Sequence, residues 1–211
     1  HKNVYFPHRV ENILQAKDVA ARTPDLLAEF VNQHGGLIQN NHVYRSAETA
    51  GQFDYSPESY PTIANTEILP DVAYYNGKEY KLDGEKAVRE FLNRGGKIGF
   101  VKGTDTHDCR PAARTAVLAE ELTRPGVIES LRGRHTYAVT LDRILCDFKI
   151  NGNLMGLEIE CRINPQITGY VQGTDKIKKI DIIRNGDILF TIHPCIHQSE
   201  IEFTDHKPAV D

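Results

Sequence analysis

The chain of 211 residues lacks several features that mark particular classes of protein. No apolar run approaches the roughly 18 residues that a membrane-spanning helix needs. A basic surplus is also missing: the net charge of −4 argues against a general nucleic-acid-binding protein. This charge does not exclude a phosphorylated small molecule, because a local site can be basic on an acidic protein. With 40% hydrophobic and 26% charged residues, the composition is that of an ordinary soluble protein without disorder.

Cysteine is scarce, and its spacing contains no CxxC pair or other tight framework. Free thiols in a reducing compartment are therefore the favoured interpretation. The cysteines are Cys109, Cys146, Cys161 and Cys195.

The beginning of the chain shows no signal peptide. It starts at His1 rather than at methionine, directly before the apolar run Val4–Phe6. We therefore expect that the natural N-terminus has been removed, together with any targeting segment. A cytoplasmic location is the default expectation, and a secreted or periplasmic one stays open.

The first two thirds of the chain repeat a pattern of helix, glycine pair and strand. Thr23–Asp25 begins a helix, since a capping hydroxyl precedes a proline and an acid in the first turn. Gly35 and Gly36 end this helix. Residues 37–41 then read as a buried strand, which runs into His42.

The pattern recurs later in the chain. Asp83 can cap a helix whose apolar residues occupy 87–92, and Gly95-Gly96 ends it. Residues 97–101 follow as a strand and lead into Gly103–His107.

A third strand is expected at Asn65–Leu69, and a third helix after Thr123 with Pro125 near its start. Such units imply an α/β fold with parallel strands covered by helices. In α/β folds the carboxyl ends of the strands carry the chemistry.

The pattern changes after about Tyr137. Two apolar-rich strand pairs surround Asn151-Gly152 and Asn185-Gly186. Asn-Gly at such a position is a strong hairpin signal, because both residues accept positive φ. We interpret residues 136–211 as a small β-sandwich-like domain that follows an α/β region of residues 1–135.

Asp105 and His107 are candidate metal ligands because, in an extended segment, residues two apart project from one face. A carboxylate and an imidazole suit Zn²⁺, Mn²⁺ or Fe²⁺. The motif alone also fits a hydrogen-bonded pair at a strand end. His42 strengthens the metal interpretation, since it occupies the equivalent place in the earlier unit. A metal there would lower the pKa of a bound water and supply a hydroxide nucleophile for a phosphoryl or acyl substrate.

Other residues near these positions fit the binding of a substrate. Arg110 and Arg114 could hold a phosphate or carboxylate bidentately, although surface salt bridges explain them equally well. Tyr44 and Arg45, just past His42, could line the same pocket.

The segment Gly99–Pro111 (GFVKGTDTHDCRP) resembles the last metal motif of the polymerase-and-histidinol-phosphatase (PHP) superfamily, and within it a bacterial branch without assigned function. A weaker match covers His1–Phe6 and the region of His42. The resemblance extends to about residue 190. It continues collinearly through 114–117, 120–124, 131–132, 134–140, 142–145, 148–152 and 155–156.

The resemblance implies a distorted barrel with two or three metals at one mouth and phosphoesterase activity. It predicts that residues 1–135 form the C-terminal part of such a TIM-like barrel. Asp105 and His107 match the final Asp-x-His ligands, and His42 the histidine on the preceding strand. His1 resembles the ligand after the family's acidic motif, and Glu67 an acid that supports the ligands rather than binding metal. The expected partner is a phosphorylated small molecule rather than a nucleic acid or a membrane.

The chain departs from the family in one major respect. The opening His-x-His motif, the next histidine and the Gly-x-Glu motif should precede His1, and none is present. Three interpretations follow: the chain is a fragment, another chain supplies the missing half of the barrel, or the protein no longer catalyses.

Two further hypotheses stay open. Residues 136–211 could be a binding module for a glycan or a partner protein, with the preceding region as a scaffold. His193, Cys195 and His197 alternate and could form part of a zinc site, although Pro194 makes a loop equally plausible.

Overall fold

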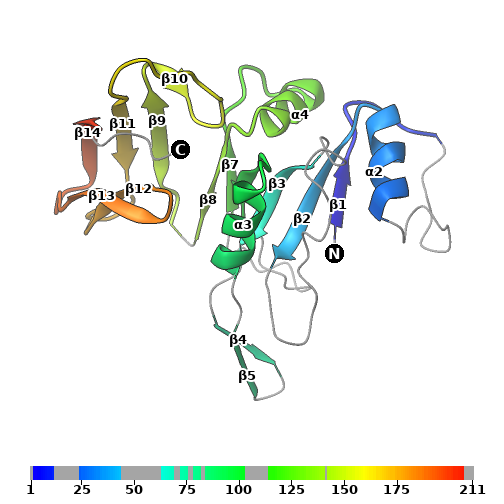
Figure 1. The fold of residues 1–211 in the computed structure, drawn as a ribbon, viewed down its shortest axis with the longest axis horizontal. Helices are drawn as coiled ribbons and strands as arrows, with labels where there is room; N and C mark the ends of the chain where they lie inside the picture. The colour runs from blue at the N-terminus through cyan, green and yellow to red at the C-terminus, as the bar shows by residue number, and fades with distance from the viewer. Residues whose placement is uncertain are drawn as a thin grey trace. The chain divides into compact units, whose positions relative to one another are not determined.

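The computed structural model describes residues 2–11, 24–43, 63–68, 72–75, 78–81, 84–102, 114–140 and 142–206. The chain forms two compact units, His1–Ala138 and Val139–Asp211 (Figure 1). Within the described residues, no helix is long and apolar enough to cross a membrane.

The first unit is built on a four-stranded sheet. Its order is β1 (Lys2–Tyr5), β2 (Leu37–Val43), β3 (Ile63–Ile68) and β6 (Gly99–Val101). β1 is antiparallel to β2, whereas β2, β3 and β6 are mutually parallel. The helix–strand repeat therefore predicted the parallel direction of these three strands, and β1 adds an antiparallel edge.

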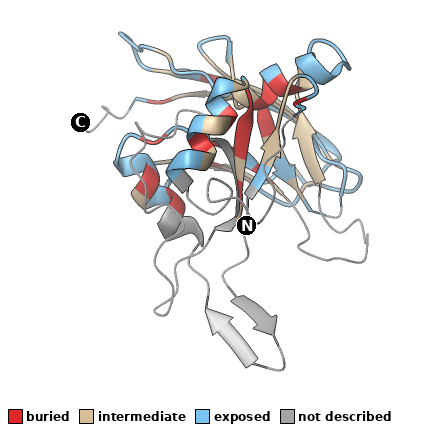
Figure 2. Cartoon of the chain, turned by 90° about the vertical axis from the view of Figure 1, so that its right-hand side faces the viewer, coloured by how far each residue is buried: buried red, intermediate tan, exposed pale blue. Residues whose placement is uncertain are grey.

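Helices lie on both faces of this sheet. Ile38 packs with residues of α2 (Pro24–Gln33) and α3 (Gly84–Asn93) in one apolar cluster. The adjacent Leu37 packs with Ile128 and Leu131 of α4 (Arg124–Arg132) in another. Because successive residues of a strand point to opposite faces, these two clusters place α4 opposite α2 and α3. Buried residues accordingly recur along the strands and helices in Figure 2.

The three helices lie where they were predicted, although the predicted caps Thr23 and Asp83 are outside the described residues. The glycine pair after α3 shows why each glycine is needed. Gly95 adopts φ 87°, a conformation that L side chains rarely accept. Gly96 meets a different constraint, because a Cβ there would lie 2.2 Å from Cε1 of Phe91. The first glycine is needed for the backbone turn and the second for the close packing of α3 against the following strand.

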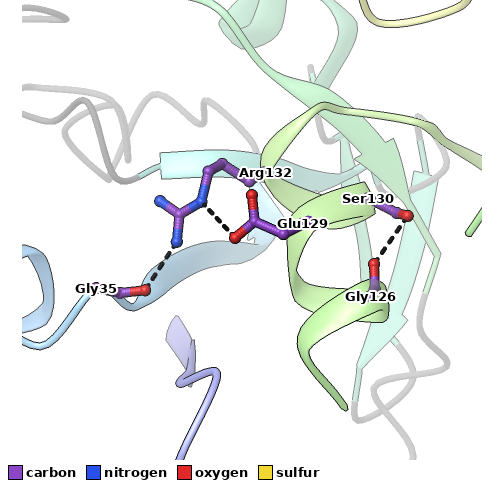
Figure 3. A network of polar contacts seen from close by, with 5 residues as sticks. All are labelled: Gly35, Gly126, Glu129, Ser130 and Arg132. Atoms are coloured by element: carbon purple, nitrogen blue, oxygen red, sulfur yellow. Dashed lines mark hydrogen bonds and ion pairs between the residues drawn. The ribbon is translucent and has the colours of Figure 1, made fainter. Parts of the chain in front are cut away.

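Helix α4 is fixed to the sheet at both ends. The hydroxyl of Thr123 caps its N-terminus by accepting from the backbone N–H of Gly126 at 3.2 Å. Arg124 Nε donates to the carbonyl of Phe6 at 2.9 Å. Arg132 Nη2 donates to the carbonyl of Gly35 at 2.7 Å (Figure 3). The helix therefore has a defined position over β1 and β2.

Two small pairs complete the first unit. β4 (Val72–Tyr75) and β5 (Lys78–Lys81) form a hairpin, and β7 (Arg114–Val117) pairs with β8 (Thr136–Val139). The buried hydroxyl of Thr136 donates to the carbonyl of Phe100 at 2.9 Å. This bond ties the β7–β8 pair to β6.

The second unit consists of an antiparallel sheet and a hairpin. The sheet has the order β10, β9, β11, β14. Asn151 and Asn185 have φ 50° and 54°, and the glycines that follow them have φ 77° and 88°. The predicted Asn-Gly turns are therefore confirmed. The strands are β9 (Leu145–Ile150), β10 (Asn153–Leu154), β11 (Gln166–Gln172), β12 (Ile180–Arg184), β13 (Asp187–Ile192) and β14 (Gln198–Thr204).

One apolar cluster joins the hairpin to the sheet of the second unit. Ile182 of β12 packs with Ile167, Val171 and Ile201 of β11 and β14. Beside it, Arg184 forms an ion pair with Asp205, whose side chain is almost fully buried. The apolar cluster and the ion pair both hold the β12–β13 hairpin against the sheet.

The predicted fold class, part of a TIM-like barrel followed by a β-sandwich-like domain, is wrong. Among the described strands, the sheets are small, separate and open, and most strand pairs are antiparallel. The physical reason is that a helix–strand repeat specifies parallel pairing but not closure. Closure depends on the number of strands and their stagger, which a local pattern does not encode.

Gly96→Ala should lower the free energy of unfolding by about 1–3 kcal/mol, because the added methyl group collides with the Phe91 ring in a packed core. Urea denaturation of the purified protein measures this change. Lys97→Ala, at the neighbouring exposed position, is the control and should change stability little. Equal stability of the two variants would contradict the packing described for α3.

Asp181 should make the stability of the second unit depend on pH in the acid range. Lys179, whose Nζ lies 2.6 Å from the carboxylate, and the Thr191 hydroxyl at 2.8 Å lower the pKa of Asp181. The stabilisation is therefore complete above the unfolded pKa of about 3.9 and is lost as the pH falls from there through the lower folded pKa. The free energies of unfolding of Asp181→Asn and of the parent, measured with urea between about pH 3 and 7, should approach each other toward the acid end. A constant difference would refute this assignment.

Candidate functional site

The carboxyl ends of three parallel strands meet at one edge of the first unit's sheet. Val43, the last residue of β2, is paired with Ile68, the last residue of β3. Glu67 of β3 is paired with Val101, the last residue of β6. In open α/β sheets this edge is where ligands bind.

Two of the predicted site residues have their backbones at this edge. His42 is the next-to-last residue of β2, and Glu67 the next-to-last residue of the adjacent β3. The sheet therefore brings their main chains to the ends of neighbouring strands. Their side chains lie outside what the structure describes.

Most other predicted site residues lie outside the described residues, so their meeting at this edge stays a prediction. Arg114 is described: it begins β7, is half-buried and already takes part in a further interaction. The residues outside are His1, Tyr44, Arg45, Asp105, His107 and Arg110.

The segment that contains the Asp-x-His motif has its two ends joined by one side chain. The Thr115 hydroxyl accepts from the backbone N–H of Lys102 at 3.0 Å and donates to the carbonyl of the same residue at 3.2 Å. Lys102 follows β6, and Thr115 lies in β7. The chain therefore leaves and returns at the carboxyl end of β6. Thr115 was not among the predicted site residues, because a single threonine 13 residues from its partner forms no recognisable sequence motif.

The proposed zinc ligands of the second unit do not form a site. His193, Cys195 and His197 follow β13 in a loop rather than sharing a strand face. His193 Nδ1 lies 3.2 Å from the carbonyl of Lys178, and the Cys195 amide donates to that of Ile177. Across the described part of the chain, no three His, Cys, Asp or Glu residues are grouped to hold a metal. The zinc hypothesis for this loop is therefore wrong.

The three described cysteines, Cys146, Cys161 and Cys195, are free thiols. Burial, and secondarily the charge of Asp147, raises the pKa of Cys146. Cys146 lies among the apolar residues of the second unit's core. Its thiol therefore stays protonated at neutral pH, which makes it a poor nucleophile and a poor metal ligand.

A pocket of about 690 Å³ lies between β1 and α4. The aromatic residues Tyr5 and Phe6 form part of one wall, and Val127 and Leu131 part of the other. This volume is in the range of about 300–1,000 Å³ typical of small-molecule sites. No local sequence pattern predicts this pocket, because its walls come from segments more than 100 residues apart.

Comparison with known proteins finds three chlamydial relatives, each described as an uncharacterised protein. The chain is 36% identical over 143 residues to a protein of Chlamydia trachomatis serovar D and 35% identical over 143 residues to one of Chlamydia muridarum. Each match covers 59% of this chain and 23% of the relative. A Chlamydia pneumoniae protein is 36% identical over 100 residues, which are 44% of this chain and 16% of that protein.

The chain thus spans less than a quarter of the length of these relatives. No protein-family description and no solved structure matches it.

Thr115→Val should accelerate hydrogen exchange at the Lys102 amide by about 10-fold or more, because it removes the hydroxyl oxygen that accepts this proton at a half-buried position. Thr115→Ser keeps the hydroxyl and should restore slow exchange. Mass-spectrometric or NMR exchange measures both. If the valine and serine variants exchange alike, the hydroxyl does not hold the two ends of the segment together.

Proposed function

We propose that this chain carries part of the active site of a divalent-metal-dependent hydrolase that acts on phosphoesters. The observation that supports it most is the shared edge of β2, β3 and β6, where the backbones of His42 and Glu67 lie. The segment that contains Asp105 and His107 begins and ends at the same edge, because the Thr115 hydroxyl bonds to the backbone of Lys102.

The donor atoms expected at this edge are suitable for a divalent cation. His42, Asp105, His107 and His1 would hold the metal, with Glu67 orienting them by hydrogen bonds. Imidazole nitrogen and carboxylate oxygen together suit Zn²⁺, Mn²⁺ or Fe²⁺. When bound, the metal supplies Lewis acidity and an activated water for attack on phosphorus.

The remaining residues of this proposal bind the substrate. Arg110 would hold the phosphoryl oxygens, and Arg114, anchored at the start of β7, would add positive charge nearby. Tyr44 and Arg45 would line the side next to β2. The proposed substrate is a small phosphorylated molecule.

The resemblance of Gly99–Pro111 to the last metal motif of the PHP superfamily supports the same chemistry, without the barrel. The motifs that the chain lacks are expected in other parts of the intact protein. The relatives are consistent with this view, since the chain covers only 23% of the length of two of them.

A second candidate function is recognition of a partner protein by the second unit. Ile183 and Ile188 are paired across β12 and β13, and 61% and 55% of their surfaces are exposed. Paired exposed isoleucines favour a contact with another protein. The hydrolase requires a bound metal and partner recognition does not. The metal content of the purified chain therefore distinguishes the two candidate functions.

Elemental analysis of the purified chain should find about one Zn, Mn or Fe per molecule. His107→Ala and His42→Ala should each lose most of it, because each removes a ligand. His8→Ala, at an exposed position away from the strand ends, is the matched control and should keep the metal. Metal retained in both ligand variants would overturn the proposed site.

Hydrolysis of p-nitrophenyl phosphate and bis-p-nitrophenyl phosphate tests the reaction itself. Activity should require the metal and fall about 100-fold or more in His107→Ala, as expected when a ligand of a catalytic metal is lost. Metal binding without hydrolysis of any phosphoester would keep the metal centre and reject the phosphoesterase.

A further inference from the structure

Four polar side chains of β1 and β2 form a closed ring of hydrogen bonds. Asn3 Nδ2 donates to the Tyr5 hydroxyl at 3.3 Å, which donates to Gln39 Oε1 at 3.0 Å. Gln39 Nε2 donates to Asn41 Oδ1 at 2.8 Å, and Asn41 Nδ2 returns to Asn3 Oδ1 at 3.1 Å. Every member donates once and accepts once. All four lie on the face of the sheet that α4 covers in part, as the packing of Tyr5 against that helix's cluster shows.

The ring, called here the amide ring, fixes the orientation of three primary amides. Each NH₂ group uses one N–H within the ring and keeps the second for another partner, and each amide oxygen keeps a lone pair. A closed chain of donors and acceptors also polarises its members cooperatively. No charged side chain belongs to it. The amide ring therefore presents paired neutral donors and acceptors rather than a charge.

Tyr5 connects the amide ring to the pocket between β1 and α4. Its hydroxyl belongs to the ring, and the residue also lines the pocket together with Phe6, Val127 and Leu131. The pocket walls are fixed, because Arg124 at the start of α4 donates to the carbonyl of Phe6 at 2.9 Å. The pocket and the amide ring thus share Tyr5, whereas the three amides lie next to the residues that line the pocket rather than among them.

We propose that this pocket and the amide ring bind a small neutral carbohydrate. A pyranose has an apolar C–H face, which would pack against Tyr5 and Phe6. Its neighbouring hydroxyls both donate and accept, so two of them match the free N–H and the oxygen lone pair of one amide. A purely apolar ligand would leave the second N–H and the remaining lone pair of each amide unused. The ring offers no charge to an anion, and Arg124, which lines the pocket, already donates to the carbonyl of Phe6.

The amide ring borders the proposed metal site, because Asn41 directly precedes His42 and Asn3 lies two residues after His1. The sugar proposal requires no metal, since it uses only the amides and the pocket. The site is formed by β1, β2, α4 and the residues next to them, among them Phe6 and Thr123, whose side chains are described. The amides also pair across the two strands, so a role confined to holding the strands in register is the competing explanation. Binding of a sugar at the amides distinguishes the two roles.

NMR titration of the ¹⁵N-labelled chain tests the proposal directly. Methyl β-glucoside and N-acetylglucosamine should shift the side-chain NH₂ signals of Asn3, Gln39 and Asn41 in a saturable way, at concentrations up to about 20 mM. Glycerol, which has hydroxyls but no ring face, and inorganic phosphate are the control ligands. The absence of saturable shifts, or equal shifts with glycerol, would overturn the proposal and leave the ring a structural feature.

Two variants locate the binding. Gln39→Leu removes two bonds of the ring, and Val127→Trp fills the pocket while leaving the ring intact. Each should weaken sugar binding about 10-fold or more. Gln172→Leu, on an exposed strand position of the second unit, is the matched control. Circular dichroism verifies folding of each variant. Unchanged affinity in a folded Val127→Trp would exclude the pocket.

Discussion

The parallel pairing of β2 with β3 and of β3 with β6 is the constraint on which the rest of the first unit depends. It places three carboxyl strand ends at one edge, and helices α2, α3 and α4 cover the two faces of β2. Ile38 and Leu37, neighbours in sequence, are both about 1% exposed because one faces α2 and α3 and the other faces α4. Burial of both faces holds β2 in its register, since a shift by one residue would exchange the two sets of side chains.

Helix α4 shows how the same sheet creates a pocket as well as a core. Its C-terminal half buries Leu131 against Leu37, and Arg132 fixes this end to Gly35. At its N-terminus, the Arg124 bond to Phe6 holds the helix beside the edge strand β1. The pocket therefore lies between two elements that this hydrogen bond holds together.

The two units are stabilised by different means. The first contains helices packed on a mixed sheet, whereas the second has one apolar cluster between a sheet and a hairpin. In the second unit, the Arg184–Asp205 pair adds specificity at the edge of that cluster, because a buried carboxylate requires a partner. The chain's share of its chlamydial relatives, less than a quarter of their length, fits a region that works within a larger protein.

Local signals in the sequence determined the helices, most of the major strands and the turns. Thr123 caps α4, and the Asn-Gly pairs adopt positive φ, because these are properties of a few adjacent residues. The edge strand β1 and the strands β11 and β14 carried no such signal and were not predicted. For the candidate site, the sequence supplied the ligand types and their position after strands. Only His42 and Glu67 can be followed to the shared edge, and only by their main chains.

The tertiary structure alone decided that the sheets are open, that Thr115 closes the segment after β6, and that Tyr5 joins an amide ring to a pocket. Each of these features depends on contacts between residues far apart in the chain. Thr115 and Lys102 are 13 residues apart, Tyr5 and Gln39 are 34, and Arg124 and Phe6 are 118. Periodicity, capping and turn propensity describe interactions within a few residues, whereas closure and site assembly depend on how whole elements pack.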